Sequence, residues 1–185
     1  MNSVPKSSAQ TFSVADYLGW PDDERWELID GVPYNMSPAP SIKHQNVVIT
    51  IAAKLKTALK GKPCKPFIAP VDVILSEHDV VQPDLLVVCN PEKIGEKAIH
   101  GAPDLVVEVL SPSTALKDMR EKKALYERAG VQEYVVIDPL ENYVQRFFLG
   151  DDGRYASAEV FGTDEDLPLL SLPELILPLA EVFEL

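Results

Sequence analysis

The sequence predicts an α/β (α+β) domain built on a mixed β-sheet flanked by helices. The chain has 185 residues, of which 46% are hydrophobic and 25% charged, an ordinary composition for about one globular domain. Two near-continuous apolar runs, residues 84–89 and 104–110, are typical of central strands covered on both faces. A helical pattern over residues 115–129, followed by a strand-like segment at 134–138, completes a strand–helix–strand unit, which is right-handed if its strands are parallel.

Cap and turn signals predict the elements of the first third. Ser13, followed three residues later by Asp16, forms a capping box for a short helix over residues 13–18. Strands are expected over residues 25–30 and 32–36, because Asp30-Gly31 is a strong hairpin-turn signal. After a breaker at residues 37–40, Ser41 caps a long helix that ends near residue 60. Its apolar stripe comprises Val48, Ile51, Ala52, Leu55 and Leu59.

The remaining elements follow from apolar runs bounded by turn residues. Strands are expected over residues 67–75, 84–89, 104–110, 134–138, 143–149 and 155–161. Ser113 or Thr114 caps the second long helix, Gly130 ends it, and a short helical turn is expected near residues 178–183. We expect a flexible N-terminal tail over residues 1–11 and a single domain over residues 12–185.

Charge is unevenly distributed along the chain. The formal net charge is −12, but residues 150–185 contain nine acidic residues and one basic residue, a net of −8 that leaves −4 for the rest. This total argues against a protein that coats nucleic acid non-specifically. Several basic residues cluster along and just after the first long helix, and phosphate contact, if present, is expected from this lysine-rich end. They are Lys43, Lys54, Lys56, Lys60, Lys62 and Lys65.

Cysteine content and hydropathy predict a soluble cytoplasmic protein. The spacing of Cys64 and Cys89 fits no zinc motif, and we expect two reduced thiols. The N-terminal residues are polar and lack the apolar core of a signal peptide. No apolar run approaches the ~20 residues that span a bilayer, so no membrane association is expected.

Two charged residues stand where the pattern demands apolar side chains. Glu108 lies inside the apolar run 105–110, where a carboxylate is costly unless it is paired or binds a metal. The alternatives are that Glu108 faces solvent or pairs with a buried Arg or Lys. Lys122 falls in the middle of the apolar face of the helix over residues 115–129. Its alternative is a long stem that reaches solvent at the helix edge.

Strand geometry selects the acid that could share a metal with Glu108. Asp104 lies four residues away on the same strand, about 13 Å at ~3.3 Å per residue, which is too far for one cation. Asp84 begins a different strand, and adjacent pairing could bring it within ~5 Å of Glu108. We therefore favour Asp84 and interpret Asp104 as a residue that begins its strand.

Glu27 and His44 are further candidates. Glu27 lies within the apolar segment 26–29, where solvent exposure is an equally good interpretation. His44 lies one turn before Val48 on the apolar stripe, where a satisfied core histidine is the alternative. Carboxylates together with a lysine are the chemistry of metal-assisted hydrolysis of an anionic substrate. They suit Mg²⁺, which activates water while a lysine positions it or balances charge on phosphate oxygens.

A set of motifs follows in order along the chain, at residues 27–31, 36–38, 44, 82–84, 101–114, 118–126 and 130–139. Taken together, these motifs resemble the Uma-two family of bacterial restriction-endonuclease-like proteins, within the PD-(D/E)XK nuclease superfamily. The similarity runs from about residue 12 to residue 183. One departure is that the superfamily pattern has a lysine two positions after the glutamate, where this chain has Leu110.

The resemblance implies a restriction-endonuclease-like fold and a metal-dependent DNA endonuclease. It implies that Asp84 and Glu108 bind Mg²⁺, with Mn²⁺ as a substitute, that Lys122 is the catalytic lysine and that Glu27 is an accessory acid. His44 would lie near the substrate. A non-catalytic nucleic-acid-binding module and a regulatory homodimer on the same fold remain alternatives. A homodimer is expected because symmetric dimers are the commonest soluble assembly.

Overall fold

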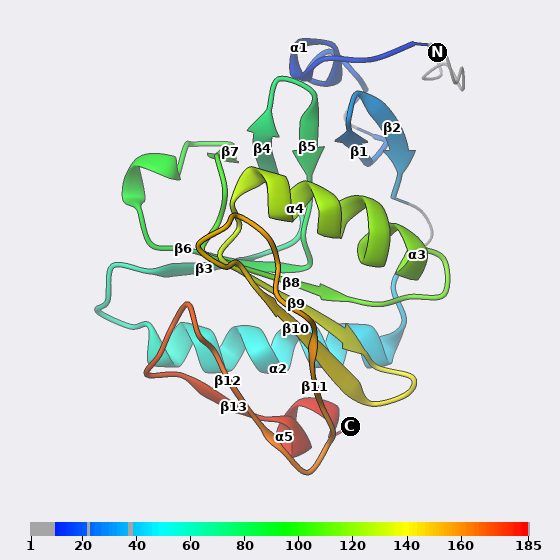
Figure 1. Cartoon of the computed structure of the whole chain (residues 1–185). Coiled ribbons are helices and arrows are strands. Elements are labelled where there is room, and N and C mark those ends of the chain that lie inside the picture. Colours follow the sequence, from blue (N-terminus) through cyan, green and yellow to red (C-terminus); the bar gives the residue numbers. More distant parts are fainter. Residues whose placement is uncertain (1–9, 22, 37–38, 185) are drawn as a thin grey trace.

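A six-stranded sheet forms the centre of the molecule in the computed structural model, which describes residues 10–21, 23–36 and 39–184 (Figure 1). The order of its strands is β11-β10-β9-β8-β6-β3. The strands are β3 (Lys65–Ile68), β6 (Leu85–Val88), β8 (Leu105–Val109), β9 (Glu133–Asp138), β10 (Tyr143–Phe148) and β11 (Glu159–Phe161). Within this sheet only β8 and β9 pair in parallel, so the sheet is mixed, as the sequence predicts.

Helices cover both faces of this sheet (Figure 1). α2 (Ile42–Ala58), capped by Ser41, packs on one face. The chain that links β8 to β9 covers the other face with α3 (Ala115–Lys117), a π-helical turn η2 (Asp118–Lys122) and α4 (Lys123–Ala129). The predicted strand–helix–strand unit is therefore confirmed, although its helix contains a π turn.

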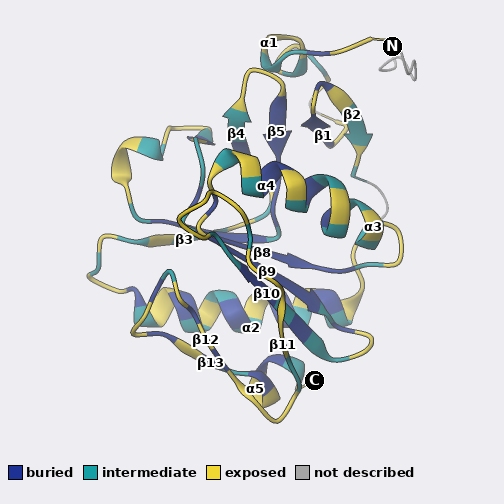
Figure 2. Ribbon diagram, in the orientation of Figure 1, coloured by how far each residue is buried: buried dark blue, intermediate teal, exposed yellow. Residues whose placement is uncertain are grey.

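Residues of the central strands alternate between two hydrophobic cores. Leu85 and Val107 pack with α2, whereas Leu86 and Val106 pack beneath α4. Because strand side chains point alternately to opposite faces, both cores are built from the same strands. β6 and β8 are buried along their whole length, as predicted for central strands (Figure 2).

A second sheet of order β2-β1-β5-β4-β7 lies at the α4 side of the molecule (Figure 1). Its strands are β1 (Trp26–Ile29), β2 (Val32–Asn35), β4 (Asp72–Ser76), β5 (Asp79–Val81) and β7 (Ala98–His100). The β1–β2 hairpin turns at Asp30-Gly31, and α1 (Val14–Tyr17) begins with the predicted Ser13–Asp16 capping box. Buried Phe12 packs in this region.

The C-terminal part of the chain lies along α2. It contains β12 (Asp166–Pro168), β13 (Ile176–Pro178) and α5 (Leu179–Phe183), where the sequence predicts a helical turn. Its leucines complete the core on that side of the central sheet. Buried Glu133 holds this segment, because its carboxylate accepts hydrogen bonds from the backbone of Leu170 and Ser171. A short 3-10 turn, η1 (Pro91–Lys93), follows β6.

Two predicted strands are wrong in their extent. Residues 67–75 form parts of two strands in different sheets, β3 and β4, separated by the cis Ala69–Pro70 bond. Pro70 has no N–H to donate to a ladder, and the chain leaves the central sheet here and enters the second sheet. The strand predicted over residues 155–161 contains only Glu159–Phe161, and Tyr155 makes an isolated bridge to Leu149.

The prediction of two reduced thiols is also wrong, because Cys64 and Cys89 form a disulfide. β3 and β6 pair antiparallel with Lys65 opposite Val88, which places Cys64 opposite Cys89. Linear spacing along the chain does not reveal such register. Most of the predicted tail (residues 1–9) and part of the predicted breaker (Ser37 and Pro38) lie outside the described residues.

Candidate active site

Antiparallel pairing of β6 with β8 brings the two predicted metal ligands side by side. Leu85 is opposite Val107, so the next pair in the register is Asp84 with Glu108. The Asp84 carboxylate accepts a hydrogen bond from the backbone N–H of Val109, at 2.8 Å. Asp104 lies at the other end of β8 and accepts from the backbone N–H of Cys89, which agrees with its interpretation as a structural residue.

Glu108 is buried in the centre of the sheet and is paired from α4 and the π turn. Its Oε1 accepts hydrogen bonds from Lys122 Nζ at 2.8 Å and from Tyr126 Oη at 2.7 Å. Within the described part of the chain, no donor contacts Glu108 Oε2. The alternative in which Glu108 faces solvent is therefore wrong, whereas pairing with a buried lysine is correct.

Lys122 joins Glu108 to Glu27. It is 2% exposed, and its Nζ lies 2.8 Å from Glu27 Oε1 and 3.7 Å from Asp118 Oδ1. Glu27 is also buried, so the alternative in which it faces solvent is wrong; Lys117 Nζ binds its second oxygen at 2.6 Å. The lysine predicted to face inward thus sits among carboxylates from three elements, β1, β8 and the π turn.

The pKa values in this cluster follow from burial and from the opposed charges. Burial raises the pKa of Glu108 to about 8, and the Lys122 ammonium offsets only part of that rise. Burial also disfavours charge on Lys122, but the carboxylates of Glu108 and Glu27 outweigh it and hold the pKa of Lys122 well above its usual value. Burial opposes ionisation of Glu27, yet its two lysine partners lower that pKa.

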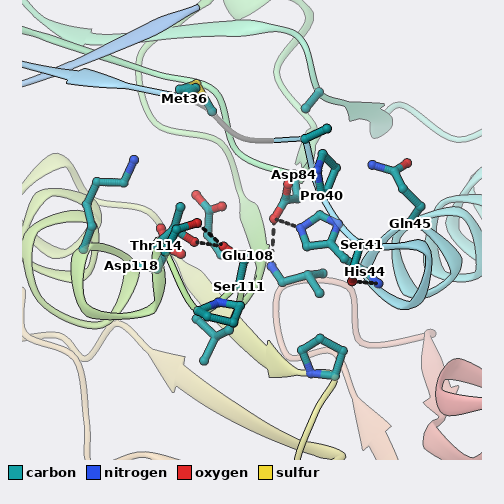
Figure 3. A pocket seen from close by; sticks show the side chains of 18 of the residues that line it. Met36, Pro40, Ser41, His44, Gln45, Asp84, Glu108, Ser111, Thr114 and Asp118 are labelled. Atoms are coloured by element: carbon teal, nitrogen blue, oxygen red, sulfur yellow. Dashed lines mark hydrogen bonds and ion pairs between the residues drawn. The ribbon is translucent and has the colours of Figure 1, made fainter.

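His44 reaches the site from the first turn of α2. Figure 3 shows the His44 ring pointing toward Asp84, and His44 Nε2 lies 3.2 Å from Asp84 Oδ2. The imidazole is 6% exposed, and its Nδ1 is buried with no hydrogen-bond partner among the described residues. Sequence reasoning left open whether His44 is a core residue or belongs to the site; the structure places it beside the acid that begins β6.

These groups line one cavity of about 580 Å³ between the N-terminus of α2 and the π turn (Figure 3). Asp84, Glu108, Lys122 and His44 all line it. Glu27 does not line the cavity, but it is paired with Lys117 and Lys122, which do. Further lining comes from residues 110–114, where Ser111 Oγ lies 3.0 Å from Thr114 Oγ1.

The residues present fit a magnesium ion bound by two carboxylates. Among the described residues, no group of three or more His, Cys, Asp or Glu side chains is arranged to hold a metal. Mg²⁺, however, keeps several waters and is commonly bound by one or two carboxylates together with substrate phosphate. Asp84 Oδ1 and Glu108 Oε2 receive no hydrogen bond from the described chain, so each carboxylate keeps one oxygen for a cation.

Sequence reasoning missed several residues of the cluster. Lys117 and Asp118 lie on a polar stretch of helix that resembles any solvated face, and nothing in the sequence shows that Lys117 contacts Glu27. Tyr126 lies on the apolar face of this helix, where its ring packs, but its hydroxyl also donates to Glu108. The signal that could have found Asp118 is its position four residues before Lys122, which places both on one face of a helix.

Comparison with a solved structure agrees with this fold. A crystal structure from Anabaena variabilis ATCC 29413, described as "a putative nuclease belonging to DUF820", superposes with a TM-score of 0.77 at 22% identity, covering 93% of this chain and 97% of that chain. The shared architecture is the restriction-endonuclease-like fold expected from the sequence.

Two proteins of Synechocystis sp. (strain PCC 6803) are also similar. "Uncharacterized protein slr1290" is 28% identical over 155 residues, 82% of this chain and 81% of that protein. "Uncharacterized protein sll1609" is 22% identical over 167 residues, 87% of this chain and 94% of that protein.

No helix among the described residues is long and apolar enough to cross a membrane.

The family model Uma2, described as "Putative restriction endonuclease", matches residues 14–180. The matched range includes the five residues of the candidate site: Glu27, His44, Asp84, Glu108 and Lys122. The chain therefore belongs to the Uma2 family of restriction-endonuclease-like proteins.

Proposed function

We propose that this chain is a divalent-metal-dependent endonuclease that hydrolyses phosphodiester bonds in DNA. The observation that carries the proposal is the convergence of Asp84 and Glu108 from adjacent strands, with Lys122 Nζ 2.8 Å from the Glu108 carboxylate. The family match supports a nuclease. Mg²⁺ is the proposed cofactor and Mn²⁺ a substitute, because both prefer oxygen ligands.

Each side chain has a distinct role in the proposed reaction. Asp84 and Glu108 would hold the cation, which when bound supplies an activated water and charge neutralisation at the phosphate. Lys122 keeps its proton, because its pKa lies well above its usual value, so it acts as a cation rather than as a base. Its charge balances negative charge that develops on the phosphate oxygens. Glu27 positions Lys122 from the buried side.

His44 has a positioning role in this scheme. Its imidazole contacts the same Asp84 oxygen that accepts the Val109 N–H, which fixes the carboxylate and leaves its other oxygen without a hydrogen bond from the described residues. A histidine beside a ligating carboxylate is a common way to orient that ligand. Because His44 also lines the cavity, it is close enough for contact with bound substrate.

A plasmid-nicking assay with Mg²⁺ or Mn²⁺ tests the proposal. We expect Glu108→Gln and Lys122→Met each to lower nicking by at least ~100-fold, since each removes a charge at the reacting centre. Asp104→Asn is the matched control: it makes the same carboxylate-to-amide change at the residue that precedes β8, but among the described residues the Asp104 carboxylate contacts only the backbone N–H of Cys89. Asp104→Asn should nick like the wild type.

Equal nicking by the wild type and both site variants would overturn the assignment. Binding of DNA with no cleavage in either metal would favour the non-catalytic module instead. Calorimetric titration with Mg²⁺ separates these cases, because the module requires no metal affinity at Asp84 and Glu108. The expected homodimer stays a prediction, which light scattering of the whole chain would test.

A further inference from the structure

We propose that Arg25 binds a substrate phosphate at the edge of the cavity and that Gln82 positions it for this role. The inference rests on the proposed function, because it deepens the description of the same site. Arg25 immediately precedes β1 and lines the cavity. It lies two residues before Glu27, so both side chains leave the same face of the strand, about 7 Å apart along the chain.

Arg25 differs from the two lysines of the cavity in the kind of side chain that it contacts. Lys117 is paired with Glu27, and Lys122 is paired with Glu27 and Glu108. Arg25 is exposed, and within the described ranges it contacts no carboxylate. No carboxylate of the described residues therefore pairs with its positive charge, which can face an anion from solvent.

The partner of Arg25 is a neutral amide. Gln82 Oε1 accepts from Arg25 Nε at 3.2 Å and from Nη2 at 2.7 Å. This contact uses one edge of the guanidinium, and no hydrogen bond from Nη1 occurs among the described residues. An arginine fixed at one edge offers its remaining donors in a defined direction, which suits a phosphate.

Gln82 is itself held in place. It is 8% exposed, and its side-chain amide donates to Asp72 Oδ1 at 2.8 Å and to Tyr17 Oη at 3.4 Å. Its backbone N–H donates to Glu27 Oε1 at 2.9 Å. Gln82 therefore contacts both Arg25 and Glu27, the carboxylate that pairs with Lys122. It also lies two residues before Asp84 in the chain.

DNA binding measured by fluorescence anisotropy tests the inference, with a labelled duplex in EDTA and in Ca²⁺ over a series of salt concentrations. We expect Arg25→Ala to weaken binding about tenfold, the usual loss for one charge-assisted hydrogen bond. The slope of log affinity against log salt should fall by about one, because one phosphate contact is lost. Arg25→Lys keeps the positive charge but lacks the planar guanidinium with its several N–H donors, so it should recover only part of the affinity.

The matched control is Arg154→Ala, which removes the same charge from an exposed arginine paired with Glu127 outside the cavity. It should change neither the affinity nor the salt slope. Gln82→Leu should weaken binding in the wild type but add nothing in Arg25→Ala, because the arginine that it positions is already gone. That non-additivity would not arise from a general loss of stability.

The outcomes separate the two proposals. If the wild type nicks DNA but Arg25→Ala binds and nicks like Arg154→Ala, the role of Arg25 is overturned while the endonuclease stands. If the wild type binds DNA without cleaving it in any metal, the endonuclease is overturned, and the salt slope of Arg25→Ala still decides the phosphate contact. If the wild type binds no DNA at all, both proposals are overturned.

Discussion

A buried carboxyl group decides when the site can take up a cation. Burial opposes ionisation of the Glu108 carboxyl more strongly than the Lys122 ammonium favours it, so the pKa of Glu108 is about 8 without metal. A cation must displace that proton, because only the ionised carboxylate is a ligand. The two lysines do not leave the site positively charged overall, since Glu27 neutralises part of their charge.

We therefore predict that Mg²⁺ affinity rises with pH and levels off above about pH 8. Below the raised pKa of Glu108, each pH unit should cost up to about tenfold in affinity. Calorimetric titration between about pH 6 and pH 9 measures this slope. Glu108→Gln should bind weakly with no such slope, and an equal slope in that variant would contradict the assignment to Glu108.

The raised pKa of Glu108 also makes the stability of the metal-free protein depend on pH. A carboxyl whose pKa rises from 4.5 to about 8 on folding favours the folded state while it is protonated. That contribution is fully present below about pH 4.5 and is lost as the pH rises through about 8. Urea unfolding over this range should show a larger loss in the wild type than in Glu108→Gln, which keeps only the contribution of Asp118 with its pKa also raised by burial.

Residue anomalies were the strongest predictors of the site. Glu108 and Lys122 break apolar patterns, and a buried charge requires a partner, so each predicted something nearby with opposite charge. Lys117, Asp118 and Arg25 break no pattern, because charged side chains are ordinary on exposed helix faces and before strands. Only the packing of α3 against β1 in the folded chain reveals that Lys117 contacts Glu27.

Elements were predicted where local signals and burial agree. The Ser41 cap, the Asp30-Gly31 turn and the two apolar runs each correspond to an observed element. β5 and β7 are three residues long, too short for a periodic signal. The π turn depends on how the helix packs, since Asp118 and Lys122 both turn toward the site.

The Cys64–Cys89 disulfide gives a prediction at the scale of paired strands. It closes a loop across a sequence separation of 25, so removing it should lower the free energy of unfolding by about 3 kcal/mol. The measurement is urea unfolding of the double variant Cys64→Ser, Cys89→Ser against the unreduced wild type. Reductant should lower the stability of the wild type but leave the variant unchanged.

The site should be indifferent to this bond. Cys89 lies five residues beyond Asp84, about 16 Å along the strand, at the opposite end from the cavity. Nicking by the double variant should therefore match that of the wild type below its unfolding range. Two thiols titrated in the denatured, unreduced wild type would contradict the bond itself.

At the scale of the whole molecule, the acidic C-terminal segment lies against the lysine-rich helix. Lys54 is paired with Glu181 and Lys62 with Glu174, so part of the lysine cluster is neutralised by the segment that carries most of the negative charge. Lys60 also lies sixteen residues beyond His44, about 24 Å at 1.5 Å per residue. The lysines near the C-terminal end of α2 and beyond it are therefore remote from the cavity, and phosphates near the reacting bond must be bound by other residues.

This arrangement predicts the response of DNA binding to a change of surface charge. The double variant Glu174→Gln, Glu181→Gln raises the net charge from −12 to −10 and frees Lys54 and Lys62. We expect DNA binding at low salt to strengthen roughly two- to fivefold, because two unpaired cations are added to a weakly attractive surface. The gain should vanish at high salt, where exposed charges are screened.

The control variant is Asp151→Asn, Asp164→Asn, which makes the same change in net charge at exposed residues without freeing a lysine. Its gain should be smaller at every salt concentration. Equal gains would mean that only the total charge matters and that pairing with the C-terminal segment has no effect. In either double variant the rate of cleavage of bound DNA should stay unchanged, because the substituted acids lie outside the cavity lining.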